Sequence, residues 1–314
     1  MVFSHSTHTT NRALTYSYIH IPPQLPNTRY LLFLHGFPST SYHWHHQISL
    51  FKAKGYGVIA PDLLGFGETS KPTELEMYKG EDMANDIVEI LDSEGVERLV
   101  GVAHDCYVFI DHGYMPPGGS LTTAGVQQIN RSVEAKLGFS ILGYFLLFDD
   151  DDAPGLLDEH SESVECLYFS TDEEITKKYK GALGGLRSWL TNGKTTKLPA
   201  YLSSEDHKHY EHSFSKEKGG YGPAINWYRA GLRNINEEDE QKITTAAHIL
   251  THPTLLIAST NVITAAMNIP EQMRPFVPDL TVEQITGGHW LQLEKPDEVN
   301  EILDKFVANI GREL

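Results

Sequence analysis

Cysteine and positive charge are both scarce in this sequence of 314 residues. Its two cysteines, Cys106 and Cys166, exclude a disulfide framework and allow at most one bridge, so we expect free thiols in a reducing compartment. Lysine and arginine number 25 against 42 aspartates and glutamates, which gives a net charge of −17. Because nucleic acids and anionic membrane surfaces repel such a chain, we exclude both as partners.

Long apolar runs are also missing. The first thirty residues contain no apolar run of the length that a signal peptide needs, and no stretch approaches the roughly 20 apolar residues of a membrane span. We therefore expect a soluble, cytoplasmic protein. The 40% of hydrophobic and 21% of charged residues are typical of a folded chain, and its length is ample for a substantial core.

Short apolar runs alternate with helical patterns in the first third of the chain. The expected strands are residues 30–34, 57–60 and 98–103. A helix capped by Ser39 and ended by Gly55 lies between the first two strands, and a second helix, around residues 83–91, precedes the third. This order predicts a mainly parallel sheet with helices on both faces.

The middle of the chain has a different character. It is richer in Gly, Tyr, Trp and short helical patterns, with few strand signals, and strands are expected again at residues 254–258 and 280–285 before a last helix from Pro296. We therefore expect a split core with a helical insertion. The three parts are residues 1–114 and 240–314 for the core, and 115–239 for a helical cap.

Polar motifs follow three of the expected strands. They are residues 35–38 (His-Gly-Phe-Pro), 104–105 (His-Asp) and 287–290 (Gly-Gly-His-Trp). Ligands of open parallel sheets bind beyond the carboxyl ends of the strands, so an acid and a histidine at two such ends are candidates for a nucleophile and its base. Taken singly, each motif is better explained as a capped or hydrogen-bonded loop, but three of them in this order are much harder to explain in that way.

These three motifs, together with residues 61–67 (Pro-Asp-Leu-Leu-Gly-Phe-Gly) and 226–229 (Asn-Trp-Tyr-Arg), resemble the epoxide hydrolase family. The resemblance runs from about residue 30 to the C-terminus, and haloalkane and haloacetate dehalogenases are related to that family. It implies an α/β-hydrolase fold with a helical lid. It also implies a hydrolase that acts on an ether bond, converting a small apolar epoxide and water into a vicinal diol without a cofactor or a metal.

The resemblance assigns the catalytic groups of the core. Asp105 would attack an epoxide carbon and form an ester with the enzyme, which suits a carboxylate because it is already ionised. His289 would then take a proton from the water that attacks the ester carbonyl. The backbone N–H groups of Phe37 and Cys106 would hold the oxyanion of this second step.

The resemblance also assigns groups around the substrate. Tyr144 and Tyr228 of the lid would donate hydrogen bonds to the epoxide oxygen, although each could instead be a buried tyrosine with a satisfied hydroxyl. His35 and Trp290 would line the substrate site. The histidines at positions 43, 45 and 46 could suggest a metal, but nothing else in the chain supports metal chemistry, and we interpret them as a polar first helical turn.

The sequence departs from the family directly after Asp105. A nucleophile elbow needs small residues two positions away on each side, and Ala103 fits this requirement whereas Tyr107 does not. Residues 107–111 read as the next strand, so the helix after the nucleophile is deleted. Because a parallel neighbour needs a crossover of a dozen or more residues, we expect this segment to leave the sheet or to rearrange it, and to displace Asp105.

A second departure concerns the acid that partners the histidine. The family usually places Asp after the strand that here is 254–258, but this chain reads Ser-Thr-Asn at 259–261, with no acid between Glu240 and Glu271. Without a carboxylate, the histidine loses the group that fixes its tautomer. Asp111 matches the position from which some relatives take the acid, and it is equally well a residue that caps a loop.

Three functions follow from these residues. The first is an active epoxide hydrolase. The second is a dehalogenase that uses the same Asp105, although such enzymes commonly have Trp where Cys106 stands. The third is a catalytically impaired paralogue that keeps the lid and binds apolar ligands. The presence of both lid tyrosines favours the epoxide hydrolase lineage.

Overall fold

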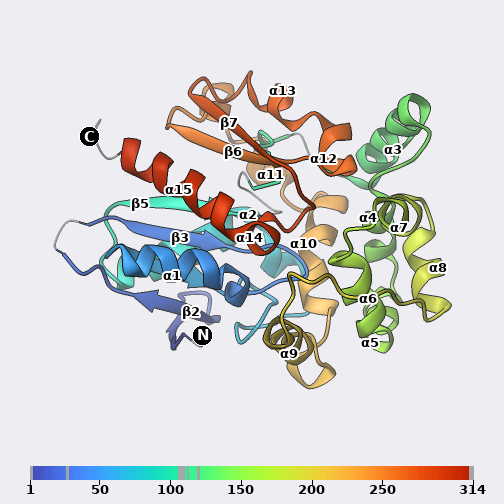
Figure 1. The fold of residues 1–314 in the computed structure, drawn as a ribbon, viewed down its shortest axis with the longest axis horizontal. Helices are drawn as coiled ribbons and strands as arrows, with labels where there is room; N and C mark the ends of the chain where they lie inside the picture. The colour runs from blue at the N-terminus through green and yellow to red at the C-terminus, as the bar shows by residue number, and fades with distance from the viewer. Residues whose placement is uncertain (1–2, 26–27, 105–109, 112, 119–120, 311–314) are drawn as a thin grey trace. The chain divides into compact units, whose positions relative to one another are not determined.

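The computed structural model describes residues 3–25, 28–104, 110–111, 113–118 and 121–310 (Figure 1). Two compact units divide the chain between them. The first consists of Met1–Ser70, Ala84–Pro116 and Thr245–Leu314, and the second of Lys71–Met83 and Pro117–Thr244. Within the described part of the chain, no helix combines the length and apolarity needed to cross a bilayer.

The first unit contains a mixed sheet and a smaller parallel pair. The five strands of the larger sheet lie in the order β1-β2-β4-β3-β5, and β6 pairs with β7. Their bounds are β1 His5–Thr9, β2 Thr15–Ile21, β3 Tyr30–Leu34, β4 Gly57–Pro61, β5 Leu99–Ala103, β6 Thr254–Ser259 and β7 Leu280–Ile285. The pairs β3·β4, β3·β5 and β6·β7 are parallel, whereas β1 and β2 add to the sheet as antiparallel strands.

The N-terminal hairpin is a strand pair that the sequence pattern did not predict. The segment His5–Thr9 holds no apolar residue, so it shows no alternation of the kind that marks a half-buried strand. It becomes a strand by pairing along its whole length with Thr15–Ile21. Edge strands of this kind take their structure from a neighbour rather than from their own composition.

Ile110 joins the two sheets. It forms one parallel bridge with His104 and another with Ile257 of β6, and the Asp111 N–H donates to the Ile257 carbonyl at 2.9 Å. The expectation that the chain after Asp105 could not lie parallel to the strand before it is therefore wrong at this residue. A full parallel neighbour needs a long crossover, but one paired residue at the end of β5 needs only a short return of the chain.

Helices cover both faces of the larger sheet. On one face, α1 (His45–Ala53) and α15 (Pro296–Ile310) pack over the strands (Figure 1). The core on this face includes Phe33, Trp44, Ile48, Phe51, Val58, Val299, Leu303 and Val307. On the other face lies α2 (Gly80–Ser93), because Tyr16 of β2 donates to Asp86 at 2.9 Å while Ile19 of the same strand points into the opposite core.

The helix expected to start at Ser39 begins slightly later. A 3-10 turn over Ser41–Trp44 leads into α1, and Thr40 is the residue at its N-terminal cap. The Ser39 hydroxyl is engaged instead with His43 Nδ1 at 2.8 Å. The C-terminal end agrees with the sequence, since Gly55 has a φ of +85° directly after the helix.

The second unit is helical, which confirms the expected helical insertion. Its helices are α3 Thr123–Leu137, α4 Gly143–Asp149, α5 Ala153–Glu159, α6 Ser161–Tyr168, α7 Glu173–Ile175, the π-helix Thr176–Gly181, α8 Gly185–Thr191, α9 Ser204–Ser213, α10 Gly222–Leu232 and α11 Glu237–Glu240. Residues 71–83 cluster with this unit, where the Gly80 N–H donates to Asn236 Oδ1 at 2.9 Å.

Gly67 ends the loop after β4 in a conformation that only glycine fits. Its φ is +50°, and a Cβ at this position would overlap the carboxylate of Asp62. That carboxylate cannot move away, because its Oδ1 accepts from the backbone and hydroxyl of Ser41 at 3.0 and 2.7 Å and its Oδ2 accepts from the Glu68 N–H at 3.1 Å. Asp62 therefore fixes this loop, and Gly67 makes room for it.

We expect Gly67→Ala to lower the free energy of unfolding, measured by urea denaturation, more than Gly95→Ala does. Gly95 also has a positive φ, of +66°, but a Cβ there meets nothing within 4 Å. The strained backbone alone should cost about 1–2 kcal/mol in both variants, and the overlap with Asp62 should add about 1–3 kcal/mol at Gly67. Equal losses in the two variants would contradict this account of the loop.

Candidate functional site

Asp111 and His289 contact each other in the first unit, although 178 positions separate them in the chain. His289 Nδ1 lies 2.8 Å from Asp111 Oδ2; the Asp111 side chain is fully buried, and the His289 side chain is 20% exposed. Because a carboxylate only accepts hydrogen bonds, Nδ1 carries the hydrogen of this contact. Nε2 is then the nitrogen of the neutral ring that can take up a proton.

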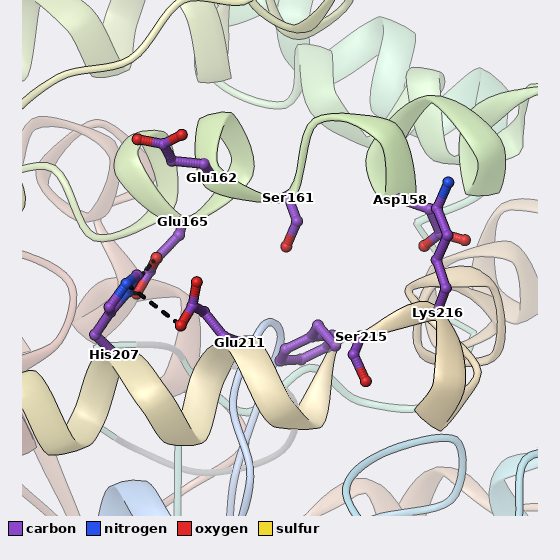
Figure 2. A pocket seen from close by; sticks show the side chains of 9 residues that line it. Asp158, Ser161, Glu162, Glu165, His207, Glu211, Ser215 and Lys216 are labelled. Carbon is purple, nitrogen blue, oxygen red and sulfur yellow. Dashed lines mark hydrogen bonds and ion pairs between the residues drawn. The ribbon is translucent and has the colours of Figure 1, made fainter.

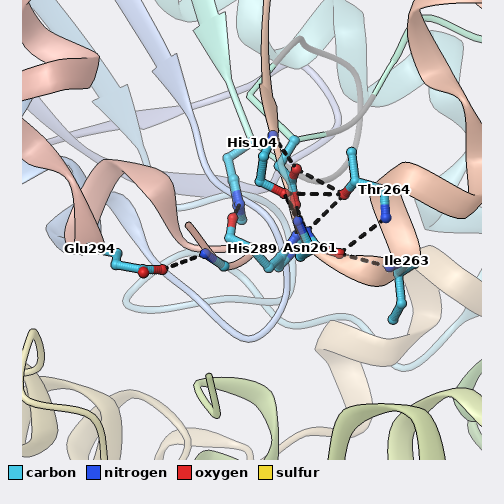
Figure 3. Close-up of polar contacts among 9 residues, drawn as sticks. His104, Asn261, Ile263, Thr264, His289 and Glu294 are labelled. Atoms are coloured by element: carbon cyan, nitrogen blue, oxygen red, sulfur yellow. Dashed lines mark hydrogen bonds and ion pairs between the residues drawn. The ribbon is translucent and has the colours of Figure 1, made fainter. Parts of the chain in front are cut away.

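The Asp111 carboxylate is surrounded by donors from the turn after β6. Oδ1 accepts from the Ser259 N–H at 2.9 Å and from the Thr264 hydroxyl at 2.8 Å, and Oδ2 accepts from Asn261 Nδ2 at 2.6 Å. With His289, four donors surround two oxygens, and Figure 3 labels Asn261, Thr264 and His289 among the residues that supply them. Such a shell satisfies a buried ionised carboxylate, which would otherwise be costly to remove from water.

Both polar atoms of the Asn261 side chain form hydrogen bonds in this turn. Its Oδ1 caps α12 (Val262–Met267) by accepting from the N–H groups of Ile263 and Thr264 at 2.9 and 3.0 Å, while its Nδ2 reaches Asp111. Where the sequence lacks an acid, at 259–261, the structure thus has donors that bind the carboxylate of Asp111. Asp111 itself has a φ of +60°, a conformation that Asp adopts more readily than most residues.

The Asp111 side chain makes contacts on two sides, and its role as the acid of the triad stays a prediction. It binds the loop after β6, and it also contacts the histidine of the Gly-Gly-His-Trp motif. Sequence reasoning did not identify the three donors, because nothing in the sequence indicates that the turn at 259–264 and the single residue after Ile110 are neighbours.

His104 supports His289 from the end of β5. Its Nε2 donates to the His289 carbonyl at 2.8 Å, and its ring centroid lies 4.5 Å from that of His289 and 4.8 Å from that of Trp290. His104 and Trp290 are both buried, so Trp290 packs within this aromatic group. In the sequence, His104 was noted only as the residue before Asp105 in the His-Asp motif. The contacts of His104 with His289 and Trp290 were not predicted.

His35 ties two loops together. It is fully buried, its Nδ1 donates to the Gly36 carbonyl at 2.9 Å, and its Nε2 accepts from the Leu63 N–H at 2.9 Å. Burial lowers the pKa of His35, in keeping with a neutral ring that donates at one nitrogen and accepts at the other. Both ring nitrogens of His35 are thus hydrogen-bonded to backbone groups of the protein. A contact between His35 and substrate stays a prediction.

The oxyanion site and the nucleophile are described only in part. Phe37 is buried beside Phe66, with ring centroids 6.5 Å apart. Asp105 and Cys106, the predicted nucleophile and the second oxyanion donor, lie outside the described residues. Their roles stay predictions that rest on the sequence.

Tyr144 and Tyr228 lie together in the second unit. Tyr144 is in α4 and Tyr228 in α10, their ring centroids are 6.0 Å apart at 75°, and both residues are buried. Phe148 packs against both rings, at 5.7 and 4.8 Å. Arg229, the next residue after Tyr228, donates from Nε to the Phe148 carbonyl at 2.8 Å, so the Asn-Trp-Tyr-Arg motif fixes α10 against α4.

A polar cavity of about 190 Å³ lies elsewhere in the second unit, beside α6 and α9 (Figure 2). Its lining includes Glu162, Glu165, His207 and Glu211. His207 Nδ1 lies 2.9 Å from Glu165 Oε2. None of the residues that the sequence singled out lines this cavity, so it is separate from the predicted site.

Among the described residues, no group of three or more His, Cys, Asp or Glu side chains is arranged to hold a metal ion. This covers the acidic cavity and the histidines near α1. His43 Nδ1 is engaged with Ser39, and His45 Nδ1 donates to the Tyr42 carbonyl at 3.1 Å.

The comparisons with known proteins agree on one fold. Residues 30–106 match the family model described as alpha/beta hydrolase fold. The chain is 26% identical to "Epoxide hydrolase A" of Mycobacterium tuberculosis (strain ATCC 25618 / H37Rv), over 91% of this chain and 92% of that protein. It is 24% identical to "Bifunctional epoxide hydrolase 2" of Sus scrofa, over 96% of this chain but only 56% of that protein.

A solved structure extends this likeness to the fold of the whole chain. The structure described as "Epoxide hydrolase from an endophytic Streptomyces" superposes with a TM-score of 0.79 at 22% identity, covering 98% of this chain and 96% of that one. At this identity, the superposition supports the fold alone.

We expect Asp111→Asn to lower the free energy of unfolding in urea by about 1–3 kcal/mol, because an amide hydrogen would face one of the four donors. We also expect the Nδ1–H tautomer of His289, read from imidazole ¹⁵N shifts, to lose population. Asp304→Asn is the matched control, because Asp304 is a partly exposed acid paired with Lys54. An unchanged tautomer in Asp111→Asn would contradict the contact.

The Glu165–His207 pair should make stability depend on pH. Burial raises the pKa of Glu165, outweighing the opposite effect of His207, and the hydrogen bond to Glu165 raises the pKa of His207. Both shifts favour the protonated forms in the folded state. The stabilisation from each group is therefore complete below its ordinary pKa, which is 4.5 for Glu165 and 6.5 for His207. It is lost as the pH rises through the raised pKa of that group in the folded protein.

His207→Gln should therefore cost more stability at pH 6 than at pH 8, by about 0.5 kcal/mol, since the His207 side chain is 37% exposed and solvent screens the pair. His209→Gln on the same helix is the control. Burial lowers the pKa of His209, so its stabilisation is present above pH 6.5 and is lost as the pH falls. Urea unfolding at both pH values checks this, and an equal cost of His207→Gln at pH 6 and pH 8 is the contrary result.

Proposed function

We propose a function from the premise that this chain is an α/β hydrolase fold protein related to epoxide hydrolases. It opens a small apolar epoxide to a vicinal diol, with water as the second substrate. The observation that carries this proposal is the contact between His289 Nδ1 and the buried carboxylate of Asp111 at 2.8 Å. A histidine oriented in this way is a general base, and such a base is what the second half of the reaction requires.

In the first half of the reaction, an oxygen of the Asp105 carboxylate attacks an epoxide carbon. The C–O bond of the ring breaks as the new ester bond forms, and a proton passes from a tyrosine hydroxyl to the epoxide oxygen. Tyr144 and Tyr228 are the donors. Their adjacency in one apolar cluster with Phe148 supports this assignment, since two phenols can then act on one oxygen.

In the second half, His289 takes a proton from water, and the resulting hydroxide attacks the carbonyl carbon of the ester. The backbone N–H groups of Phe37 and Cys106 hold the oxyanion, which collapses to release the diol and restore Asp105. Asp111 stabilises the imidazolium while it exists. The proton on His289 then returns through water to the tyrosine that gave up its own, so one epoxide and one water yield one diol.

The position of His104 supports the pairing of Asp105 with His289. Asp105 is the next residue in the chain after His104, and the His104 ring lies 4.5 Å from the His289 ring. The chain therefore reaches the neighbourhood of the base one residue before the proposed nucleophile. This neighbourhood is built by β5, Ile110 and the Gly-Gly-His-Trp motif, all within the first unit.

A second candidate function is that of a binding protein of the same lineage without turnover. Only five residues lie between His104 and Ile110, and this short connection favours an altered nucleophile loop. A dehalogenase using Asp105 is the third. The fold and the His289–Asp111 contact are common to all three candidate functions. The chemical modification that Asp105 undergoes with substrate therefore distinguishes them.

Single-turnover hydrolysis of an aryl epoxide in H₂¹⁸O tests the proposal directly. Because the diol takes its new oxygen from Asp105, the first diol formed should carry no ¹⁸O, and the label should appear on the Asp105 peptide by mass spectrometry. In His289→Ala the ester should persist, adding the mass of the epoxide to that peptide, and kcat should fall by about 10²–10⁴-fold.

Asp105→Ala should abolish both the diol and the label, whereas Asp304→Ala should leave both unchanged. If Asp105→Ala makes diol as fast as the unmodified protein, the proposed reaction through an ester on Asp105 is excluded. If the epoxide binds but no label reaches Asp105, the binding protein is the better account. Halide release from a haloalkane that depends on Asp105, without diol from the epoxide, would instead identify a dehalogenase.

A further inference from the structure

Lys180 is a buried cation beside Tyr144 in the second unit. It is 8% exposed, and its Nζ lies 5.2 Å from the centroid of the Tyr144 ring and 4.8 Å from that of the Tyr168 ring. The two rings are 6.0 Å apart and perpendicular to each other. The ammonium is therefore within reach of two aromatic faces at once, which is the arrangement of a cation–π contact.

Two glycines bring Lys180 to this place. Lys180 and Gly181 end the π-helix Thr176–Gly181, and a Cβ on Gly181 would overlap the Ser140 carbonyl. On the opposite side, a Cβ on Gly143, the first residue of α4, would overlap the Ala182 carbonyl. The backbones of residues 140–143 and 181–182 thus touch, and this close contact sets Lys180 against the residue that follows Gly143.

Burying the ammonium group of Lys180 costs free energy, so the contacts of this group should explain why it is buried. Removing a charge from water is opposed by a large loss of hydration, and contact with a ring face offsets part of it. A positive charge next to a phenol also stabilises negative charge on that phenol. Tyr144 is the residue on which the proposed reaction places such charge, when its proton passes to the epoxide oxygen.

We propose that Lys180 is a positioning residue for Tyr144, which holds the Tyr144 ring and stabilises the phenolate that forms as the epoxide opens. The proposal rests on the function proposed above. No covalent bond to Lys180 is involved, and Lys180 keeps its own proton. The proton leaves Tyr144 for the epoxide oxygen, and Tyr144 recovers one from His289 through water.

Two arginines on helices packed against α4 bind other groups of the chain. Arg229 in α10 donates to the carbonyls of Phe148 and Asp150, and Arg187 in α8 pairs with Asp150 and Asp152. The Tyr144 ring also packs against the phenol rings of Tyr168 and Tyr228. Lys180 is thus the cation whose contact with the Tyr144 ring the structure records.

The test is a pH titration of tyrosine ¹³Cζ resonances, with the Tyr144 signal assigned by its loss in Tyr144→Phe. In Lys180→Met the midpoint of Tyr144 should rise by about one pH unit, because the phenolate loses its cation. Lys178→Met is the matched control, since Lys178 is an exposed residue of the same π-helix whose Nζ faces the ring of Tyr179 instead. It should leave the Tyr144 midpoint unchanged.

Lys180→Arg keeps the charge, so its Tyr144 midpoint should stay at or below that of the unmodified protein. This variant also serves if Lys180→Met does not fold. A rise in Lys180→Arg, or no rise in a folded Lys180→Met, would overturn the proposal. In kinetics, Lys180→Met should lower kcat about tenfold with KM within twofold, and Lys180→Arg should restore most of the loss.

The titration does not depend on turnover of substrate. The epoxide hydrolase function and the role of Lys180 can therefore be refuted independently of each other. A Tyr144 midpoint that responds to Lys180 in a protein that makes no diol would refute the epoxide hydrolase function alone. Diol formation that is normal in Lys180→Met, with an unmoved Tyr144 midpoint, would refute the role of Lys180 alone.

Discussion

A buried carboxylate is stable only when donors surround it, and the arrangement of the first unit meets this requirement at Asp111. Backbone, hydroxyl, amide and imidazole groups from the β6 turn and from the loop after β7 converge on two oxygen atoms. The same carboxylate sets the tautomer of His289. One electrostatic demand thus links the folding of the C-terminal part of the chain to the proton chemistry of its histidine.

The carboxylate that contacts His289 comes from the part of the chain after β5. The turn after β6 offers Asn261, whose amide donates to that carboxylate. Ile110 is bridged to both sheets, so the next residue, Asp111, lies where the two sheets meet. Its φ of +60° is a conformation that Asp adopts more readily than most residues. The bridges of Ile110 therefore both join the two sheets and set the position of Asp111.

Much of the fold could be predicted from the sequence, because buried strands and amphipathic helices carry their periodicity with them. The parallel strands, the helical insertion and the last helix follow that rule, whereas His5–Thr9 became a strand through pairing alone. The contacts of Asp111, His104 and Lys180 could not be predicted. Each depends on segments that meet only after folding, and a parallel bridge of one residue has no sequence pattern.

The single bridge at Ile110 also bears on how the first unit opens. In the described chain, the backbone ladder between the five-stranded sheet and the β6–β7 pair runs through that one residue, while α1 and α15 pack side chains against strands of both. Cooperativity between the two sheets must then come from helix packing rather than from a continuous ladder. Amide hydrogen exchange would accordingly resolve them as two foldons, with subglobal opening of the C-terminal pair at a lower free energy than global unfolding.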